Sequence, residues 1–181
     1  MEFFLLKGVI FLHTEYEVRI LNIDKEEVVA KLNKLNATFE WDELQRRYVY
    51  NLGEAEIDGT QELEIEVDSF ERTNLILKEL GYEAKGYQEN RRRQYLLNGV
   101  EIDIDSWPLI PTYLEIEGPS EEAVYNAVST LGFELDDTTT RDVEGIYLDY
   151  GHNLDEIYDL KLEEERKWSK YFKDVMRNGV G

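Results

Sequence analysis

The chain has 181 residues, of which 40 are Asp or Glu and 20 are Lys or Arg, so its formal net charge is −20 at pH 7. This length predicts one domain, with or without a terminal appendage, and a hydrophobic fraction of 42% is enough for a core. Such an acidic chain argues against a nucleic-acid backbone or an anionic membrane as the main partner.

Cysteine is absent, which excludes a disulfide framework, a thiolate nucleophile and a Cys-ligated zinc site. The only histidines, His13 and His152, are far apart in the sequence. Any metal is therefore expected to be a hard ion held by carboxylates, such as Mg²⁺ or Mn²⁺. The lack of cysteine fits a reducing cytoplasm, which we expect as the location.

The first segment, residues 1–13, is apolar but is interrupted by Lys7. It is too short to span a bilayer, and it lacks the basic region and cleavage site of a secretory signal. We expect an N-terminal extension that packs against the domain, with a weak signal peptide as the alternative.

Four short segments then share one pattern, in which carboxylates alternate with apolar residues: 15–20, 62–68, 101–105 and 113–117. A strand has a period of two, so each segment directs its carboxylates to one face. Carboxylates two residues apart lie about 6.7 Å from each other and repel by roughly 2.5 kcal/mol at an effective dielectric constant near 20. The four faces are either separately exposed to solvent or converge on cations, and their number favours convergence.

Between these strands the sequence predicts helices and further strands. A helix starts at Asp24 and carries Val28 and Leu32 on one face; strands follow over residues 37–41 and 44–52. A second helix over 71–80 ends at Gly81, a long strand over 83–97 leads into the turn Asn98-Gly99, and a third helix runs from Ser120 to Gly132. This order predicts an α+β fold: an antiparallel β-barrel or strongly curved sheet with helices packed outside.

The tail, residues 153–176, reads as an amphipathic helix that docks on the domain or on a partner subunit. We therefore divide the chain into an extension (1–13), a main domain (14–150) and a C-terminal helical appendage (151–181).

Basic residues lie beside two of the acidic segments. Glu15-x-Glu17-x-Arg19 could hold a divalent metal and contact a phosphate, or could simply form ion pairs on a wet surface. Alternation places Arg91 and Arg93 on one face of the long strand and Arg92 on the other; Arg46 and Arg47 are further cations. These arginines either bind phosphate or neutralise the acidic strands.

Four segments together carry a resemblance to a known family: Glu15-x-Glu17-x-Arg19, Glu62-x-Glu64-x-Glu66, the Asp-rich segment 100–108 and Leu114-Glu115-Ile116-Glu117-Gly118. They resemble the CYTH, or triphosphate tunnel metalloenzyme, superfamily, and most of all its class IV adenylate cyclase-like branch. The resemblance covers roughly residues 14–147. It implies a tunnel-shaped antiparallel barrel that binds a triphosphate with Mg²⁺ or Mn²⁺. The metal ligands that it implies are Glu15, Glu17, Glu64, Glu115 and Glu117. The phosphate-binding residues are Arg19, Arg46, Arg91 and Arg93, with Asp103 or Asp105 as secondary acidic partners and Glu15, Glu17 and Arg93 as the catalytic set.

The chain departs from the family pattern after Asn51, where only residues 52–60 precede Gln61 and no Lys or Arg occurs between Arg47 and Arg72. Two family strands that carry basic residues are therefore expected to be missing. The resemblance implies a metal-dependent phosphohydrolase or adenylate cyclase-like enzyme acting on ATP, thiamine triphosphate or inorganic triphosphate. The alternative is a shortened, non-catalytic domain that binds metal or a phosphorylated ligand, with an open sheet edge that favours a homodimer.

Overall fold

The computed structural model describes residues 16–50, 67 and 69–162. Several predicted features lie outside the described residues. They are the N-terminal extension, Glu15, the second acidic segment with Glu64, the shortened link 52–60 and residues 163–181.

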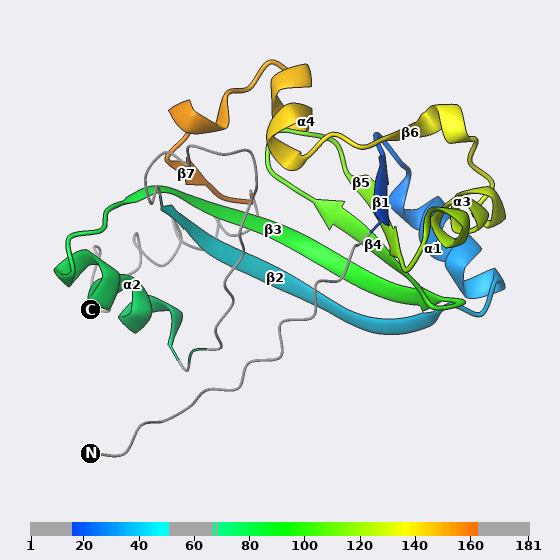
Figure 1. The fold of residues 1–181 in the computed structure, drawn as a ribbon, viewed down its shortest axis with the longest axis horizontal. Helices are drawn as coiled ribbons and strands as arrows, with labels where there is room; N and C mark the ends of the chain where they lie inside the picture. Colours follow the sequence, from blue (N-terminus) through cyan, green and yellow to red (C-terminus); the bar gives the residue numbers. More distant parts are fainter. Residues whose placement is uncertain (1–15, 51–66, 68, 163–181) are drawn as a thin grey trace, which may run out of the picture.

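One antiparallel sheet organises the described chain, in the order β2-β3-β4-β5-β1-β6 (Figure 1). Its short last strand β7 pairs in parallel with β3 beyond the end of β4. The strands are β1 (Tyr16–Ile20), β2 (Thr38–Tyr50), β3 (Ala84–Leu97), β4 (Val100–Ser106), β5 (Tyr113–Gly118), β6 (Thr138–Thr139) and β7 (Asp159–Leu160).

Within the described residues, four α-helices and two short 3₁₀ helices connect these strands: α1 (Lys25–Lys34), α2 (Phe70–Glu79), α3 (Glu121–Thr130), η1 (Leu135–Asp137), α4 (Val143–Asp149) and η2 (Leu154–Glu156). The first three begin as the sequence predicts, because the side chains of Asp24, Ser69 and Ser120 each accept a hydrogen bond from a backbone N–H in the first turn. In Figure 1, α2 lies at one end of the long β2–β3 ribbon, and α1 and α3 lie at the other end.

The two faces of the sheet are covered differently. On one face, the apolar side chains of β1, β3, β4 and β5 pack against Val28 and Leu32 of α1 and Val124 and Val128 of α3. On the opposite face, a smaller core joins α4 and β7 to the sheet; its members are Trp107, Ile110, Tyr113, Ile146, Tyr147 and Leu160. The rest of this second face carries the acidic residues.

The expected α+β fold with a curved antiparallel sheet is confirmed. Within the described residues the sheet is not closed, because its edge strands β2 and β6 do not pair with each other. The two strands expected over 37–41 and 44–52 are one strand, β2, with an irregularity in its pairing between Phe39 and Trp41.

The described portion of the expected C-terminal appendage, 151–162, contains η2 and β7. No described helix has the length and apolar character needed to cross a membrane.

Candidate functional site

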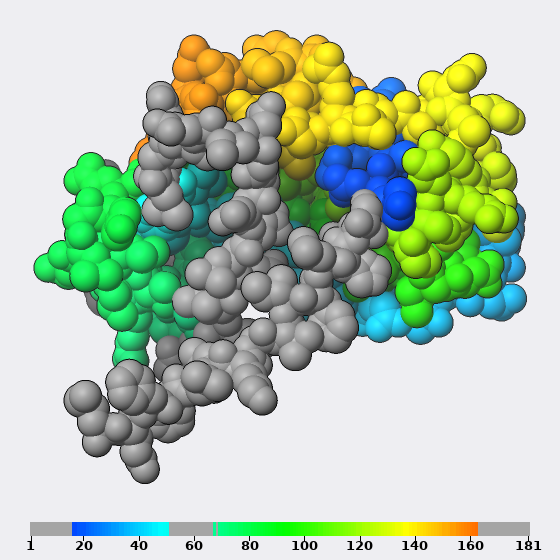
Figure 2. Space-filling view, in the orientation of Figure 1, coloured from blue at the N-terminus to red at the C-terminus, as the bar shows by residue number. Residues whose placement is uncertain are grey.

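Charged side chains from four strands meet on the sheet face that α4 partly covers. Cross-strand partners in an antiparallel sheet share a face, so the register places these residues together. The pairs are Glu17 with Glu117, Arg19 with Glu115, Asp103 with Glu115, and Arg92 with Asp105. We call this set, Glu17, Arg19, Arg92, Asp103, Asp105, Glu115 and Glu117, the charged face. In the space-filling view, β1 (blue) lies beside the β6 segment (yellow) (Figure 2).

Arg92 binds the carboxylates of β4 and β5. Its Nη1 lies 2.8 Å from Asp103 Oδ2, and its Nη2 lies 2.6 Å from Asp105 Oδ2 and 2.8 Å from Glu115 Oε1. These three carboxylates are at most 7% exposed, so they are costly to keep ionised without a cation beside them. Burial lowers the pKa of Arg92, but Asp105, Glu115 and Asp103 outweigh it, and the net shift is upward.

Arg19 of β1 has a similar role at the other side of Glu115. Its Nε lies 2.7 Å from Glu115 Oε2, and its Nη2 lies 3.1 Å from Glu17 Oε2. Its Nη1 donates to the Arg141 carbonyl oxygen at 2.9 Å, which ties the loop before α4 to the sheet. Glu115 therefore bridges two arginines, Arg19 and Arg92.

Three glutamates form the candidate metal ligands. One carboxylate oxygen from each of Glu17, Glu115 and Glu117 lies within 4.8 Å of the other two. An ion with metal–oxygen distances of about 2.1 Å needs ligand oxygens within about 4.2 Å of one another. Oxygen-only donors at nearly this separation fit a hard divalent cation such as Mg²⁺ or Mn²⁺.

Burial shifts two pKa values on β4. Burial, reinforced by Asp105 and Glu115, raises the pKa of Asp103 to about 7 even though Arg92 opposes the shift. Burial also raises the pKa of Asp105, against the effect of Arg92. Asp103 Oδ1 is buried without a hydrogen-bond partner in the described structure, so this face is not fully neutralised.

Arg47 of β2 extends the basic side of the face. Its Nη2 donates to Asn90 Oδ1 at 2.6 Å and to Gln45 Oε1 at 3.3 Å, and its guanidinium stacks on Trp107 at 4.7 Å from the ring centroid. Asn90 in turn donates to Asp105 Oδ1 at 3.0 Å. Among the described residues, no carboxylate lies within 4.0 Å of Arg47, unlike Arg19 and Arg92. Burial, together with the nearby Arg92, lowers its pKa.

The structure brings together Glu17, Arg19, Glu115 and Glu117, as the sequence predicts, but it does not bring Arg46, Arg91 and Arg93 to them. Arg91 and Arg93 lie on the opposite face of β3, where both bind Asp42 of β2. Arg46 forms an ion pair with Glu71 at 3.4 Å and stacks on Phe70, both from α2. The physical reason is strand alternation, since Arg47 and Arg92 take the places on the charged face. Glu15 and Glu64 lie outside the described residues.

The sequence contains a signal that places Arg92 opposite Asp105. The turn Asn98-Gly99 has positive φ angles of 54° and 81°, as a two-residue type I′ hairpin requires. Such a turn pairs Leu97 with Val100 and so fixes the register of the whole hairpin, including Arg92 opposite Asp105. Arg47, Asn90 and Trp107 had no comparable local signal.

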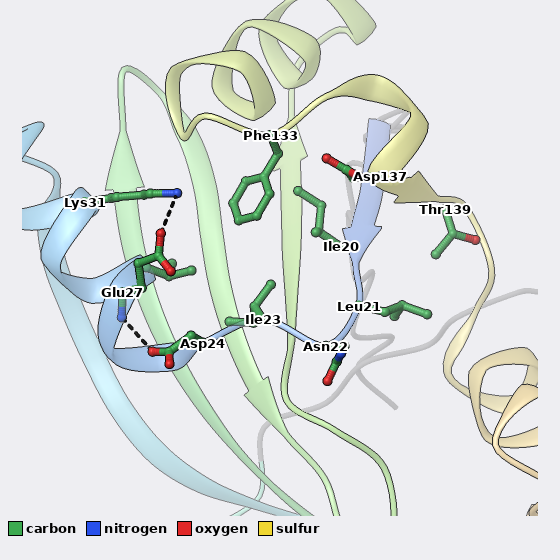
Figure 3. A pocket seen from close by; sticks show the side chains of 11 residues that line it. Ile20, Leu21, Asn22, Ile23, Asp24, Glu27, Lys31, Phe133, Asp137 and Thr139 are labelled. Atoms are coloured by element: carbon green, nitrogen blue, oxygen red, sulfur yellow. Dashed lines mark hydrogen bonds and ion pairs between the residues drawn. The ribbon is translucent and has the colours of Figure 1, made fainter.

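A separate cavity of about 550 Å³ lies on the helix side of the sheet, between α1, β1 and the segment after α3 (Figure 3). Charged groups that line it already have partners: Lys31 Nζ lies 3.2 Å from Glu27 Oε1 and stacks on Phe133, and Asp24 accepts from the Glu27 backbone N–H. No residue of the charged face lines this cavity.

Comparison with solved structures shows which class of fold this is. A conserved hypothetical protein from Pyrococcus furiosus superposes with a TM-score of 0.61 and 21% identity over 74% of this chain and 99% of that one. A candidate adenylate cyclase from Vibrio parahaemolyticus superposes with a TM-score of 0.61 and 11% identity over 74% and 97% of the two chains. A further protein, from Pyrococcus horikoshii, gives a TM-score of 0.57 and 19% identity over 74% and 96%.

No protein-family model and no curated protein matches the chain. At these identities the structural likeness is evidence for the fold alone. The chain shares its fold with these proteins, one of which is a candidate adenylate cyclase. This shared fold is consistent with the resemblance expected from the acidic strands.

Proposed function

We propose that the charged face binds a triphosphate-bearing ligand together with Mg²⁺ or Mn²⁺ and catalyses its hydrolysis or cyclisation. The observation that carries this proposal is the meeting of Glu17, Glu115 and Glu117 within 4.8 Å of one another, directly beside Arg19 and Arg92. A metal–polyphosphate complex needs both signs of charge at short range, and this face offers both.

The three glutamates would hold the metal, which supplies Lewis-acid polarisation of a phosphoryl oxygen when it is bound. Arg19, Arg92 and Arg47 are the guanidinium groups on this face that can contact phosphate oxygens. Arg19 keeps its predicted role, and Arg47 and Arg92 replace the predicted Arg46, Arg91 and Arg93. Glu15 and Glu64 keep their expected roles as further metal ligands.

The test is a substrate panel with product identification. The folded protein is incubated with ATP, thiamine triphosphate or inorganic triphosphate and with Mg²⁺ or Mn²⁺, and phosphate, pyrophosphate and cyclic nucleotide are measured. We expect metal-dependent turnover of at least one substrate, with the metal affinity lowered by more than about 10-fold in Glu117→Gln.

Glu121→Gln is the matched control, because it removes the same charge from an exposed position in the first turn of α3. It should leave turnover and metal affinity unchanged. Folded protein that turns over none of the three substrates with either metal would contradict the catalytic proposal.

Binding without turnover is the second candidate function. It is favoured by the ion pairs that Arg19 and Arg92 already form with carboxylates of the charged face. A ligand phosphate would have to displace these contacts, at a cost in affinity. This candidate predicts metal-dependent binding at micromolar or weaker affinity with no product, which calorimetry and the substrate panel together can distinguish.

A further inference from the structure

The separate cavity between α1, β1 and the segment after α3, which we call the α1 cavity, lies on the helix side of the sheet (Figure 3). Its volume of about 550 Å³ is within the range of about 300–1,000 Å³ that is usual for small-molecule pockets. Strand alternation separates it from the charged face, because Ile20 of β1 lines the cavity whereas the preceding Arg19 binds Glu115 on the other face. A ligand of the α1 cavity would therefore be additional to the metal and the triphosphate.

Apolar side chains form one wall of the α1 cavity. Ile20 and Val28 are buried members of the main core, and Ile23 and Phe133 are half-buried and pack against that core. Leu21, also half-buried, completes this wall. Such a surface favours a hydrocarbon chain, because packing against it removes apolar area from water.

The charge of the lining is negative. Four charged residues line the cavity: Asp24, Glu27, Lys31 and Asp137. Lys31 Nζ lies 3.2 Å from Glu27 Oε1, so the charges of these two residues offset each other. Asp24 and Asp137 each accept a backbone N–H at 2.9 Å, and neither forms an ion pair within the described part of the chain. Because a neutral N–H leaves the charge of a carboxylate in place, the cavity carries two uncompensated negative charges.

The arrangement of these two charges narrows the class of ligand. Figure 3 shows Asp24 and Asp137 on opposite sides of the cavity, with Ile20 and Ile23 between them in this view. A divalent metal needs several oxygen ligands around one point, which two carboxylates on either side of an apolar wall do not provide. An anionic ligand is disfavoured by the sign of the charge. A hydrocarbon chain with an ammonium group at each end matches both the wall and the two carboxylates.

We propose that the α1 cavity binds an aliphatic diamine or polyamine. Its methylene chain lies along Ile20 and Ile23, and its ammonium groups pair with Asp24 and Asp137. This site is independent of the proposed function, since it uses neither the metal ligands nor the arginines of the charged face.

The experiment is an NMR titration of the full chain with diaminopropane, diaminopentane, diaminoheptane and, as the single-charge probe, pentylamine. No divalent metal is added, and ionic strength is matched because diffuse attraction to an acidic protein is screened by salt. We expect at least one diamine to bind about 5-fold or more tightly than pentylamine, since a second, partly exposed ion pair adds an amount of this order. The shift changes should be concentrated in the backbone amides of residues 20–31 and 133–139.

Two variants test the carboxylates without removing their local structural role. Asp24→Asn and Asp137→Asn each delete one charge but keep a side-chain oxygen that can accept the same backbone N–H. Each should lower the affinity for the preferred diamine to that for pentylamine. Asp136→Asn is the matched control, because Asp136 is exposed beside Asp137 and does not line the cavity. It should keep the preference for the diamine.

Three outcomes overturn the inference. The first is equal affinity for pentylamine and for every diamine in the natural chain. The second is an equal loss of diamine affinity in Asp136→Asn and Asp137→Asn, which would indicate diffuse attraction to an acidic surface. The third is a set of shift changes centred on Glu17 and Glu117, which would place the diamine on the charged face. The titration needs neither metal nor turnover, so these outcomes leave the proposed function standing.

Discussion

Arg92 illustrates how one side chain can determine both the stability and the chemistry of this sheet face. It binds Asp103, Asp105 and Glu115, which come from two neighbouring strands and are almost fully buried. Buried ion pairs add little net stability compared with an apolar core, but removing one partner leaves the others charged and unpaired. The effect of losing Arg92 should therefore be far larger than its partial exposure suggests.

We predict that Arg92→Ala lowers the free energy of unfolding by about 3 kcal/mol at pH 8, measured by urea denaturation. Some of this loss should be recovered near pH 5, where the raised pKa of Asp103 allows that carboxyl to be neutral. Arg91→Ala is the control, since Arg91 is half exposed and shares Asp42 with Arg93; it should cost no more than about 1 kcal/mol. Equal losses in the two variants would contradict the importance of the charged face.

Asp103 makes the free energy of unfolding depend on pH, and the sign of this dependence follows from the difference between its pKa in the folded and unfolded states. Its pKa in the folded protein is about 7, against about 3.9 in the unfolded chain. The folded state therefore holds this proton more tightly, and the free energy of unfolding falls as the pH rises from about 4 to about 7.

Asp103→Asn abolishes this titration because the amide is neutral throughout. Between pH 5 and pH 7, the natural chain should lose roughly 2 kcal/mol of stability relative to Asp103→Asn, and the two profiles should run parallel above about pH 7.5. Denaturant titrations of both proteins in a metal chelator measure this directly. Parallel profiles across the whole range would show that Asp103 has an ordinary pKa.

At the scale of elements, the helices differ greatly in how firmly they are held. α3 buries Val124, Ala127 and Val128 against the sheet, whereas α2 has no buried residue. Its contacts with the sheet are made by Phe70, which stacks on Tyr48 and Arg46, by Glu71, which pairs with Arg46, and by Asn74, which accepts from the Tyr50 hydroxyl. Most helical stability in proteins comes from such packing, so α2 should open more easily than α3.

We predict that amides of residues 70–80 exchange with solvent more than about 10-fold faster than amides of residues 121–131. Hydrogen-exchange mass spectrometry on peptides from the two helices measures this difference. α1, which buries Val28 and Leu32, is the control and should exchange like α3. Protection of α2 equal to that of α3 would mean that its exposed apolar residues, Leu75 and Ile76, are covered in solution.

The elements also show which features could be predicted from the sequence. Helix starts and strand faces could be predicted, because N-caps and alternation depend on nearest neighbours along the chain: Asp24 caps α1, and Glu17 and Arg19 share a face. The choice among Arg91, Arg92 and Arg93 depends on pairing between strands, which only the hairpin turn revealed. Arg47 and Trp107 meet across 60 positions of sequence, and no local rule relates them.

For the whole molecule, the net charge of −20 raises the question of whether divalent cations act at a site or merely screen the protein. Screening depends on ionic strength, whereas a site saturates at millimolar or lower concentration. We predict that Mg²⁺ or Mn²⁺ raises the melting temperature more than KCl of equal ionic strength does.

Glu117→Gln should abolish the additional rise in melting temperature that Mg²⁺ or Mn²⁺ gives over KCl. Glu121→Gln changes the net charge equally and should keep it. If KCl and Mg²⁺ are equivalent at matched ionic strength, the acidic strands affect solubility but do not form a metal site. The melting curves need no assumption about turnover, so they test the metal half of the proposed function by itself.

The run Arg91-Arg92-Arg93 has a consequence for the fidelity of folding. If β3 slipped by one residue against β4, another arginine would still face Asp105, so ion pairing alone would barely disfavour the wrong register. The same slip would move Tyr95 and Leu97 out of the apolar core and bring Gln94 and Leu96 into it. The correct pairing must therefore be enforced by the core residues and by the Asn98-Gly99 turn. Lengthening that turn by one residue should trap a misregistered sheet whose charges are nonetheless well matched.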